Sequence, residues 1–186
     1  MRGSFLDDRQ LARVWARDLL NRADWAVLDT ETTGLGNTAE VIQIAVVAPD
    51  GGTLLDTLVR PNAPIPADAT AIHGITDVMV ERAPPYLDVY PALLEVLRGK
   101  LVVCYNAAFD RRLLRQTAVR SHAPELPVAW DCAMEQYSRF IGRRSARGGS
   151  YSWQPLPRRA EYRFAKHQAI VDCLATLDVI RTMAGA

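Results

Sequence analysis

The sequence predicts an α/β fold with a central mixed sheet of five strands, an antiparallel hairpin within that sheet, and flanking helices. Short apolar runs alternate with helical stretches in the order βββαβαβα, which is typical of a mixed sheet with helices on its faces. A chain of 186 residues that is 49% hydrophobic and 23% charged suits one globular domain with a sizeable core.

The chain opens with an expected amphipathic helix at residues 5–22. Its apolar side chains follow the i, i+3, i+4 spacing of one buried stripe. They are Leu11, Val14, Trp15 and Leu19. We expect this helix to pack on the sheet as an N-terminal extension, residues 1–23, of a single domain formed by residues 24–186.

The five strands are predicted from apolar runs bounded by turn residues. They are expected at residues 25–28, 40–48, 53–60 and 101–105, with a short fifth strand leading on from residues 124–130. The turn at residues 49–52 joins the second and third strands into the hairpin. A short helix and a turn at Gly74 are predicted within residues 67–82, and further helices at residues 86–98, 107–119, 131–142 and 167–183.

Composition excludes some protein classes. No apolar run approaches the roughly 18 residues of a membrane span, and the acidic sequence after Ser4 does not resemble a secretory signal. The three cysteines lie far apart in apolar surroundings, so we expect reduced, buried thiols and a cytoplasmic protein without a membrane partner. The net charge of +1 says little about partners as a sum.

Two carboxylates follow the first strand in the stretch WAVLDTETTGLG, residues 25–36. Side chains two apart on a strand point to the same face, so Asp29 and Glu31 aim at one spot while Thr30 points away. Such a pair repels unless protons or cations neutralise it, and Mg²⁺ and Mn²⁺ prefer oxygen ligands. The alternative is that both are solvated acids at a strand end.

A third acid, Asp110, follows the fourth strand within the segment NAAFD. Asn106 suits the N-cap of the next helix, whose buried stripe contains Phe109. Asp110 precedes Leu113 and Leu114 by three and four residues and shares their inward side. The helix dipole explains an acid in the first turn, but it does not explain why that acid faces inward.

The fourth acid, Asp172, is embedded among apolar residues of HQAIVDCLAT, where a carboxylate is seldom buried without a partner. His167 lies five residues earlier, about 140° beyond a full helical turn, so the two do not share a helix face. We therefore expect His167 near a substrate and not on a metal. The alternative is a surface or core histidine without chemistry.

Positive charge gathers before His167. Residues 143–166 contain seven cations against Glu161 alone. The cations are Arg143, Arg144, Arg147, Arg158, Arg159, Arg163 and Lys166. Either this is a solvated loop, or it steers an anionic strand and binds its phosphates, with Tyr151 and Trp153 stacking on bases.

Taken together, these segments resemble the DnaQ-like exonucleases of the DEDDh type, the superfamily of the polymerase III epsilon proofreading subunit and RNase T. The resemblance covers roughly residues 24–181. It rests on DTETTG at 29–34, N-x-x-F-D at 106–110 and H-x4-D at 167–172, in this order, with IHGIT at 72–76 typical of the bacterial branch. The resemblance implies an RNase H-like fold.

The resemblance also implies a reaction, metal-dependent 3′–5′ hydrolysis of single-stranded nucleic acid to nucleoside 5′-monophosphates in proofreading or repair. Asp29, Glu31 and Asp172 would hold one divalent ion, Mg²⁺ or Mn²⁺, and Asp29 and Asp110 a second. His167 would be the general base.

The substrate would be met by a set of surrounding residues. The backbone near Thr32, Thr33 and Gly34 would contact the terminal nucleotide, and Leu35 would wedge against its base. Asn106 and Phe109 would shape the site. His73 would either line the nucleotide pocket or serve its own turn.

Other interpretations remain open at this point. An RNA-trimming enzyme of the RNase T or oligoribonuclease kind is the main alternative to a DNA exonuclease, since no residue visibly reads a 2′-OH. A non-enzymatic nucleic-acid-binding or polymerase-docking module is another, and a DNA polymerase is a possible partner. A haloacid dehalogenase-type phosphatase is disfavoured, because neither Lys100 nor Lys166 lies in a suitable motif.

Overall fold

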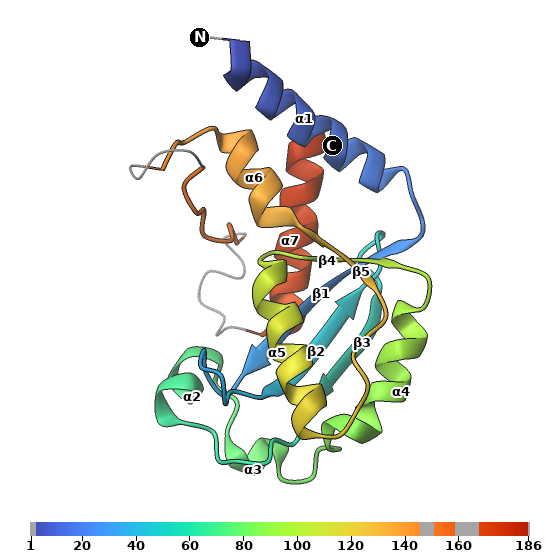
Figure 1. Cartoon of the computed structure of the whole chain (residues 1–186), viewed down its shortest axis with the longest axis vertical. Coiled ribbons are helices and arrows are strands. Elements are labelled where there is room, and N and C mark those ends of the chain that lie inside the picture. Colours follow the sequence, from blue (N-terminus) through green and yellow to red (C-terminus); the bar gives the residue numbers. More distant parts are fainter. Residues whose placement is uncertain (1–2, 146–150, 159–167, 186) are drawn as a thin grey trace.

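The structure, a computed structural model, describes residues 3–145, 151–158 and 168–185, with side chains from residue 8 onward. Its centre is a five-stranded sheet in the order β3-β2-β1-β4-β5 (Figure 1). The strands are β1 (Trp25–Thr32), β2 (Val41–Val47), β3 (Thr53–Leu58), β4 (Leu101–Cys104) and β5 (Ala129–Cys132). β1, β2 and β3 pair antiparallel, whereas β4 pairs parallel with β1 and β5. The predicted mixed sheet and its hairpin are confirmed.

Seven helices of the described residues surround the sheet. They are α1 (Gly3–Leu20), α2 (Ala67–His73), α3 (Asp77–Val80), α4 (Tyr86–Leu97), α5 (Ala107–Arg120), α6 (Ala133–Ile141) and α7 (Ala169–Ala184). The segment expected to hold one short helix forms two, because Gly74 takes the left-handed conformation at φ 78° that ends α2. Among the described helices, none is long and apolar enough to cross a membrane.

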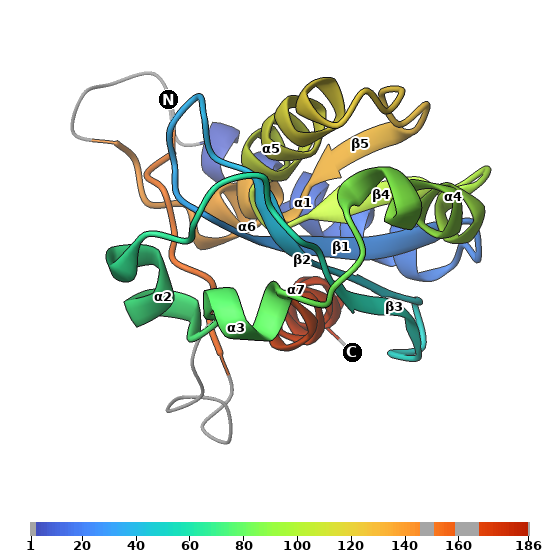
Figure 2. The ribbon, with the colours of Figure 1, turned by 90° about the horizontal axis from the view of Figure 1, so that it is seen from below.

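The sheet has two buried faces, and the alternation of β1 assigns its side chains to them. Trp25 and Val27 pack with α1, α6 and α7. Ala26 and Leu28 pack on the other side with α4 and α5. Figure 2 shows α5 and α7 on opposite sides of the sheet. Continued along the strand, the same alternation turns Asp29 and Glu31 toward α7 and Thr30 toward α5.

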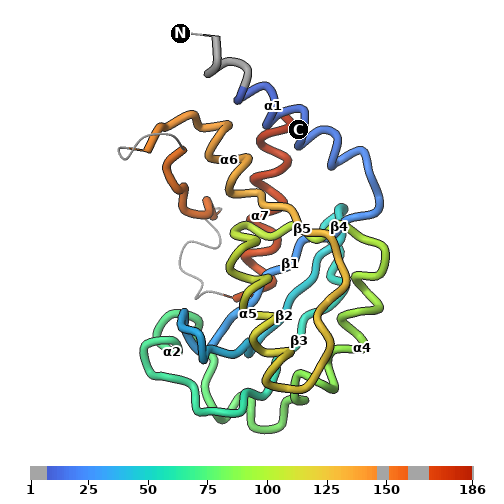
Figure 3. Tube along the Cα trace, in the orientation of Figure 1, coloured from blue at the N-terminus to red at the C-terminus, as the bar shows by residue number. Residues whose placement is uncertain are grey.

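Helix α1 lies across the C-terminal end of α7 (Figure 3), where the Arg17 side chain donates to the carbonyl of Ala184 at 3.0 Å. Its expected buried stripe is confirmed at Leu19 and wrong at Leu11 and Val14, which are 61% and 42% exposed. The other buried residues on its inner side are Ala12 and Ala16. Alanines on the inner side let the helix approach α6 and α7 closely. The indole of Trp15 instead donates to Asp131 at 2.7 Å.

The cysteines follow their prediction in part. All three thiols are free; Cys104 and Cys173 are buried, whereas Cys132 is half-buried. Burial raises the pKa of the Cys104 and Cys173 thiols well above the usual value, which keeps both protonated. They therefore act as small apolar core residues.

Candidate active site

An open cavity of about 940 Å³ lies where β1 ends, between α2, α5 and the first turn of α7. Most of the predicted site residues line it. These are Asp29, Glu31, Thr32, Gly34, Leu35, His73, Asn106, Phe109, Asp110 and Asp172. The cavity therefore gathers, from three segments far apart in the sequence, the four acids that were singled out.

Three of the four acids form a compact group. One carboxylate oxygen from each of Asp29, Glu31 and Asp172 lies within 4.8 Å of the others. Asp29 and Glu31 come from alternate positions of β1 and face α7, whose first turn carries Asp172. The two-residue period of β1 and the position of Asp172 in the first turn after Gln168 thus bring the three acids together.

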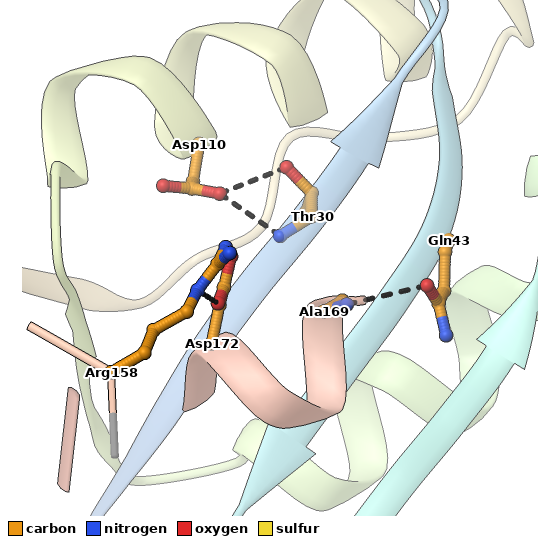
Figure 4. A network of polar contacts seen from close by, with 6 residues as sticks. All are labelled: Thr30, Gln43, Asp110, Arg158, Ala169 and Asp172. Carbon is orange, nitrogen blue, oxygen red and sulfur yellow. Dashed lines mark hydrogen bonds and ion pairs between the residues drawn. The ribbon is translucent and has the colours of Figure 1, made fainter. Parts of the chain in front are cut away.

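Asp110 reaches the cavity from α5, on the other face of the sheet. The amide N–H and the hydroxyl of Thr30 both donate to its Oδ1 atom, at 3.1 and 2.8 Å (Figure 4). Thr30 therefore does point away from Asp29 and Glu31, and its outward side chain holds the acid of the opposite face. Asp110 lies outside the compact group of three.

Burial sets the protonation of these acids. It raises the pKa of Glu31 to about 8, with the nearby Asp172 charge adding to the effect and Arg158 opposing it. Burial also raises the pKa of Asp110 to about 7, against the hydrogen bonds from Thr30. The pKa of Asp29 is raised well above its usual range, by burial first and by the charge of Asp110 next. The charged forms of these acids are therefore unfavourable without a neutralising cation.

Asp172 already has one cation beside it. Nε of Arg158 donates to Oδ1 at 2.7 Å and Nη2 donates to Oδ2 at 2.6 Å, a bidentate pair between largely buried side chains (Figure 4). The sequence had grouped Arg158 only with the other cations of its segment. The sequence shows only that Arg158 lies 14 residues before the buried Asp172, and this spacing does not predict a contact between them.

The donor set fits a hard divalent cation. Oε1 of Glu31 is buried and has no hydrogen-bond partner among the described residues, an arrangement that costs free energy unless a cation or proton satisfies it. The ligand atoms that Asp29, Glu31 and Asp172 offer are carboxylate oxygens, which Mg²⁺ and Mn²⁺ prefer. The acidic cluster therefore suits divalent metal ions.

The rim of the cavity is apolar and exposed. Leu35 is 78% exposed and Trp153 is 65% exposed, and Ile72 is also open to solvent. Half-buried Phe109 lies beneath the guanidinium of Arg112, 5.4 Å from the ring centre. The prediction singled out Leu35, Phe109 and Trp153. It missed Ile72, which it had treated only as part of a motif string.

Several predicted residues are engaged elsewhere. The Thr33 N–H donates to the Glu40 carbonyl at 2.8 Å, and Thr33 does not line the cavity. Nδ1 of His73 accepts from the Ile75 N–H at 3.0 Å, which is the expected role in its own turn, and the residue also lines the cavity. Asn106 precedes α5, but its side chain makes no capping hydrogen bond.

The basic segment is described only in part. Arg144 pairs with Asp8 at 3.9 Å and lies over the ring of Tyr151 at 4.5 Å, and the Arg143 carbonyl accepts from the Ser152 N–H at 2.8 Å. Neither arginine lines the cavity. His167 and Arg147 lie outside the described residues.

Comparison with known proteins now identifies the family. The model of the exonuclease family, named for RNase T, matches residues 26–180. The chain belongs to this family. It is a DnaQ-like exonuclease of the DEDDh type with an RNase H-like fold, as the resemblance implied.

Individual relatives are similar over most of the chain. An uncharacterized exonuclease of Escherichia phage 186, CP81, is 38% identical over 187 residues, covering 94% of this chain and 93% of that protein. Exodeoxyribonuclease 10 of Escherichia coli K12 is 33% identical over 164 residues, covering 84% and 68%. The structure of exonuclease X in complex with 5′ overhanging duplex DNA is 30% identical, covers 87% of this chain and 93% of that chain, and gives a TM-score of 0.56.

Proposed function

We propose that this exonuclease removes nucleoside 5′-monophosphates from the 3′ end of DNA in a reaction that depends on two divalent metal ions, Mg²⁺ or Mn²⁺. The observation that carries the proposal is the convergence of Asp29, Glu31 and Asp172 within 4.8 Å in an open cavity, with Asp110 beside them. Four clustered acids, one of which has a buried oxygen without a hydrogen-bond partner among the described residues, do not stabilise the fold by themselves, because their charges repel one another.

In this proposal the four carboxylates hold the metal ions. The ions would supply a nucleophile at neutral pH and stabilise the charge on the leaving 3′ oxygen. The chain's own residues orient the strand: Leu35 and Phe109 border the position of the terminal base, and the backbone near Thr32 and Gly34 faces the terminal sugar. His167 is the proposed general base, and it precedes the helix that carries Asp172 by two residues.

DNA is the proposed substrate because of the relatives, and the rim of the cavity fits a single strand of either kind. One relative is named an exodeoxyribonuclease, and a solved relative is bound to duplex DNA with a 5′ overhang. The exposed apolar side chains of Leu35, Ile72 and Trp153 offer surfaces on which unpaired bases stack without regard to the sugar. An RNA-trimming enzyme is the second candidate, since stacking alone does not exclude a 2′-OH.

A non-enzymatic docking role is disfavoured because the whole acid set is present. The proposed reaction would serve DNA proofreading or repair, with a DNA polymerase as the proposed partner. We also infer that residues 1–23 form an extension to the exonuclease domain of residues 24–186, since the family model begins at residue 26.

The test uses a DNA strand labelled at its 5′ end and an RNA strand of identical sequence. We expect stepwise shortening of the DNA from its 3′ end with Mg²⁺ or Mn²⁺, release of 5′-monophosphates, and no reaction with EDTA. A strand labelled at the 3′ end should lose its label in the first step. The same DNA placed in a duplex with a 5′ overhang tests the substrate form seen with exonuclease X.

Asp29→Ala should abolish hydrolysis and leave the fold intact. Asp18→Ala, which removes an exposed acid on α1, is the matched control and should retain wild-type turnover. Faster degradation of RNA than of DNA would favour the second candidate. Undiminished cleavage by the Asp29 variant, with contaminating nuclease excluded, would reject the assignment of the site.

A further inference from the structure

Among the described residues, Arg158 is the one arginine or lysine that lines the acidic cavity, which His73 also borders. Its guanidinium binds both oxygens of Asp172, at 2.7 and 2.6 Å. The pair is largely shielded from water, since the two side chains are 18% and 8% exposed. An ion pair so placed is much less screened than one on the surface.

This pairing conflicts with metal binding at the same carboxylate. A bidentate guanidinium occupies both oxygens of Asp172, and its charge repels any divalent ion within a few ångströms. Asp172 is also a member of the compact group with Asp29 and Glu31. A metal ion held by that group and Arg158 in its present position therefore compete for the same carboxylate.

The surroundings of Arg158 allow an exchange of partners. It lies in a segment, residues 151–158, without helix or strand apart from one isolated bridge at Tyr151. The segment is tied earlier, where the Tyr105 hydroxyl lies 2.9 Å from the Gln154 carbonyl and 3.0 Å from that of Pro155. Arg158 follows these anchors. It borders the substrate cavity and a neighbouring cavity beside Pro157.

We propose that Arg158 changes partner during the catalytic cycle. In the metal-free protein it takes the place of a cation at Asp172. When a divalent ion binds there, Arg158 is displaced and binds a phosphate oxygen of the nucleic-acid strand. A guanidinium presents the same fork of donors to a phosphate as to a carboxylate, so the exchange conserves its hydrogen bonds.

The proposal rests on the proposed function, because it assumes a metal ion and a phosphate in this cavity. Its first half has a direct test that needs no turnover. Calorimetric titration of Mn²⁺ into the wild-type protein, Arg158→Ala and Arg158→Lys measures the competition. The control is Arg120→Ala, an exposed arginine on α5.

We expect Arg158→Ala to bind the first Mn²⁺ about tenfold more tightly, within the range of ordinary coupling between two sites. Arg158→Lys should fall between the two, because a lysine keeps the charge and loses the fork. Thermal unfolding in EDTA should show a lower melting temperature for Arg158→Ala, and saturating Mn²⁺ should recover more of it than in the wild type. Unchanged or weaker Mn²⁺ binding in a folded Arg158→Ala protein would overturn the competition.

The second half is tested with thymidine 5′-monophosphate at saturating Mn²⁺. Arg158→Ala should bind this nucleotide about tenfold more weakly, within the range for a lost charge-assisted hydrogen bond, and should bind uncharged thymidine as the wild type does. Equal loss for both ligands, or no loss for the monophosphate, would overturn the phosphate contact. If Arg158→Ala changes the binding of Mn²⁺ and of the nucleotide as expected but the wild-type protein cleaves no DNA, the proposed function fails and the exchange stands.

Discussion

Asp110 and Asp172 reach the same cavity from helices on opposite faces of the sheet, yet they are held in different ways. Asp110 accepts two hydrogen bonds from Thr30, a residue fixed within the central strand. Asp172 is held by Arg158, which lies in a segment of little regular structure. One acid is thus positioned permanently by neutral donors, and the other is neutralised by a side chain that has an alternative use.

The four proposed metal ligands are therefore not equally prepared for a cation. Both hydrogen bonds from Thr30 reach Oδ1 of Asp110, so they leave Oδ2 free for a cation once the carboxyl group is ionised. In the exchange proposed above, the bidentate Arg158 leaves Asp172 when a metal ion binds. Substitutions on the side of Asp110 or on the side of Asp172 test this difference separately.

The largest effect is expected on the α7 side. His167→Ala should reduce turnover by about 10²–10⁴-fold, the usual contribution of a general base. The affinity for Mn²⁺ should change little, because His167 is proposed to act on the substrate side. Calorimetry and single-turnover cleavage with each variant measure both quantities. A loss of Mn²⁺ binding as large as that of Asp172→Ala would make His167 a ligand.

A smaller effect is expected on the α5 side. Thr30→Val removes the hydroxyl donor to Asp110 and keeps both the shape of the side chain and the backbone donor. Turnover should fall about 10- to 100-fold, the usual cost of losing a group that orients a metal ligand. Thr30→Ser restores the hydroxyl and should restore most of the rate in the same cleavage assay. Equal activity of the valine variant would mean that the backbone donor alone positions Asp110.

A pH profile tests the electrostatics of the acidic cluster without any substitution. Burial raises the folded-state pKa of Glu31 from its ordinary 4.5 to about 8, so between these values the folded protein binds more protons than the unfolded chain. Its stabilising contribution is therefore complete below pH 4.5 and is lost as the pH rises to 8. Urea titrations of the metal-free protein should show unfolding free energy falling across this window, by an amount of the order of a few kcal/mol.

Two controls accompany that profile. Saturating Mg²⁺ should flatten it by binding the charged form of the site. Glu31→Gln should make it shallower by removing one of the groups with a raised pKa, while Asp29 and Asp110 still titrate. A metal-free profile that rises with pH across the same window would show that other groups dominate the stability.

The smallest effect is expected from the basic segment. Replacing Arg143, Arg144 and Arg147 together with alanine should make the salt dependence of single-strand binding shallower, by about 0.7 in the logarithmic slope for each lost phosphate contact. Arg144 is already engaged with Asp8 and Tyr151, so we expect it to contribute less than a full contact. Hydrolysis of a nitrophenyl ester of thymidine monophosphate, which reaches no upstream phosphate, should hardly change. A wild-type slope would mark the segment as solvated surface.

The parts of this arrangement that local periodicity controls were predictable from the sequence. The two-residue period of the strand placed Asp29 and Glu31 on one face, and the helical period turned Asp110 inward. The contact between Arg158 and Asp172 was not predictable, because it depends on the path of the chain between two elements. The stripe of α1 was misread because hydrophobicity favoured Leu11, whereas close helix packing selected Ala12 and Ala16.

Helix α1 lies before the first residue matched by the family model, yet its Asp8 accepts a hydrogen bond from Tyr151, seven residues before Arg158. Its Ala12, Ala16 and Leu19 share a core with Ile180 and Met183 of α7. A truncated version that starts at the family boundary would therefore lose both part of the hydrophobic core and the hydrogen bond that holds Tyr151. Expression trials and deletion libraries cut at homology borders would then score a folding defect as a missing activity.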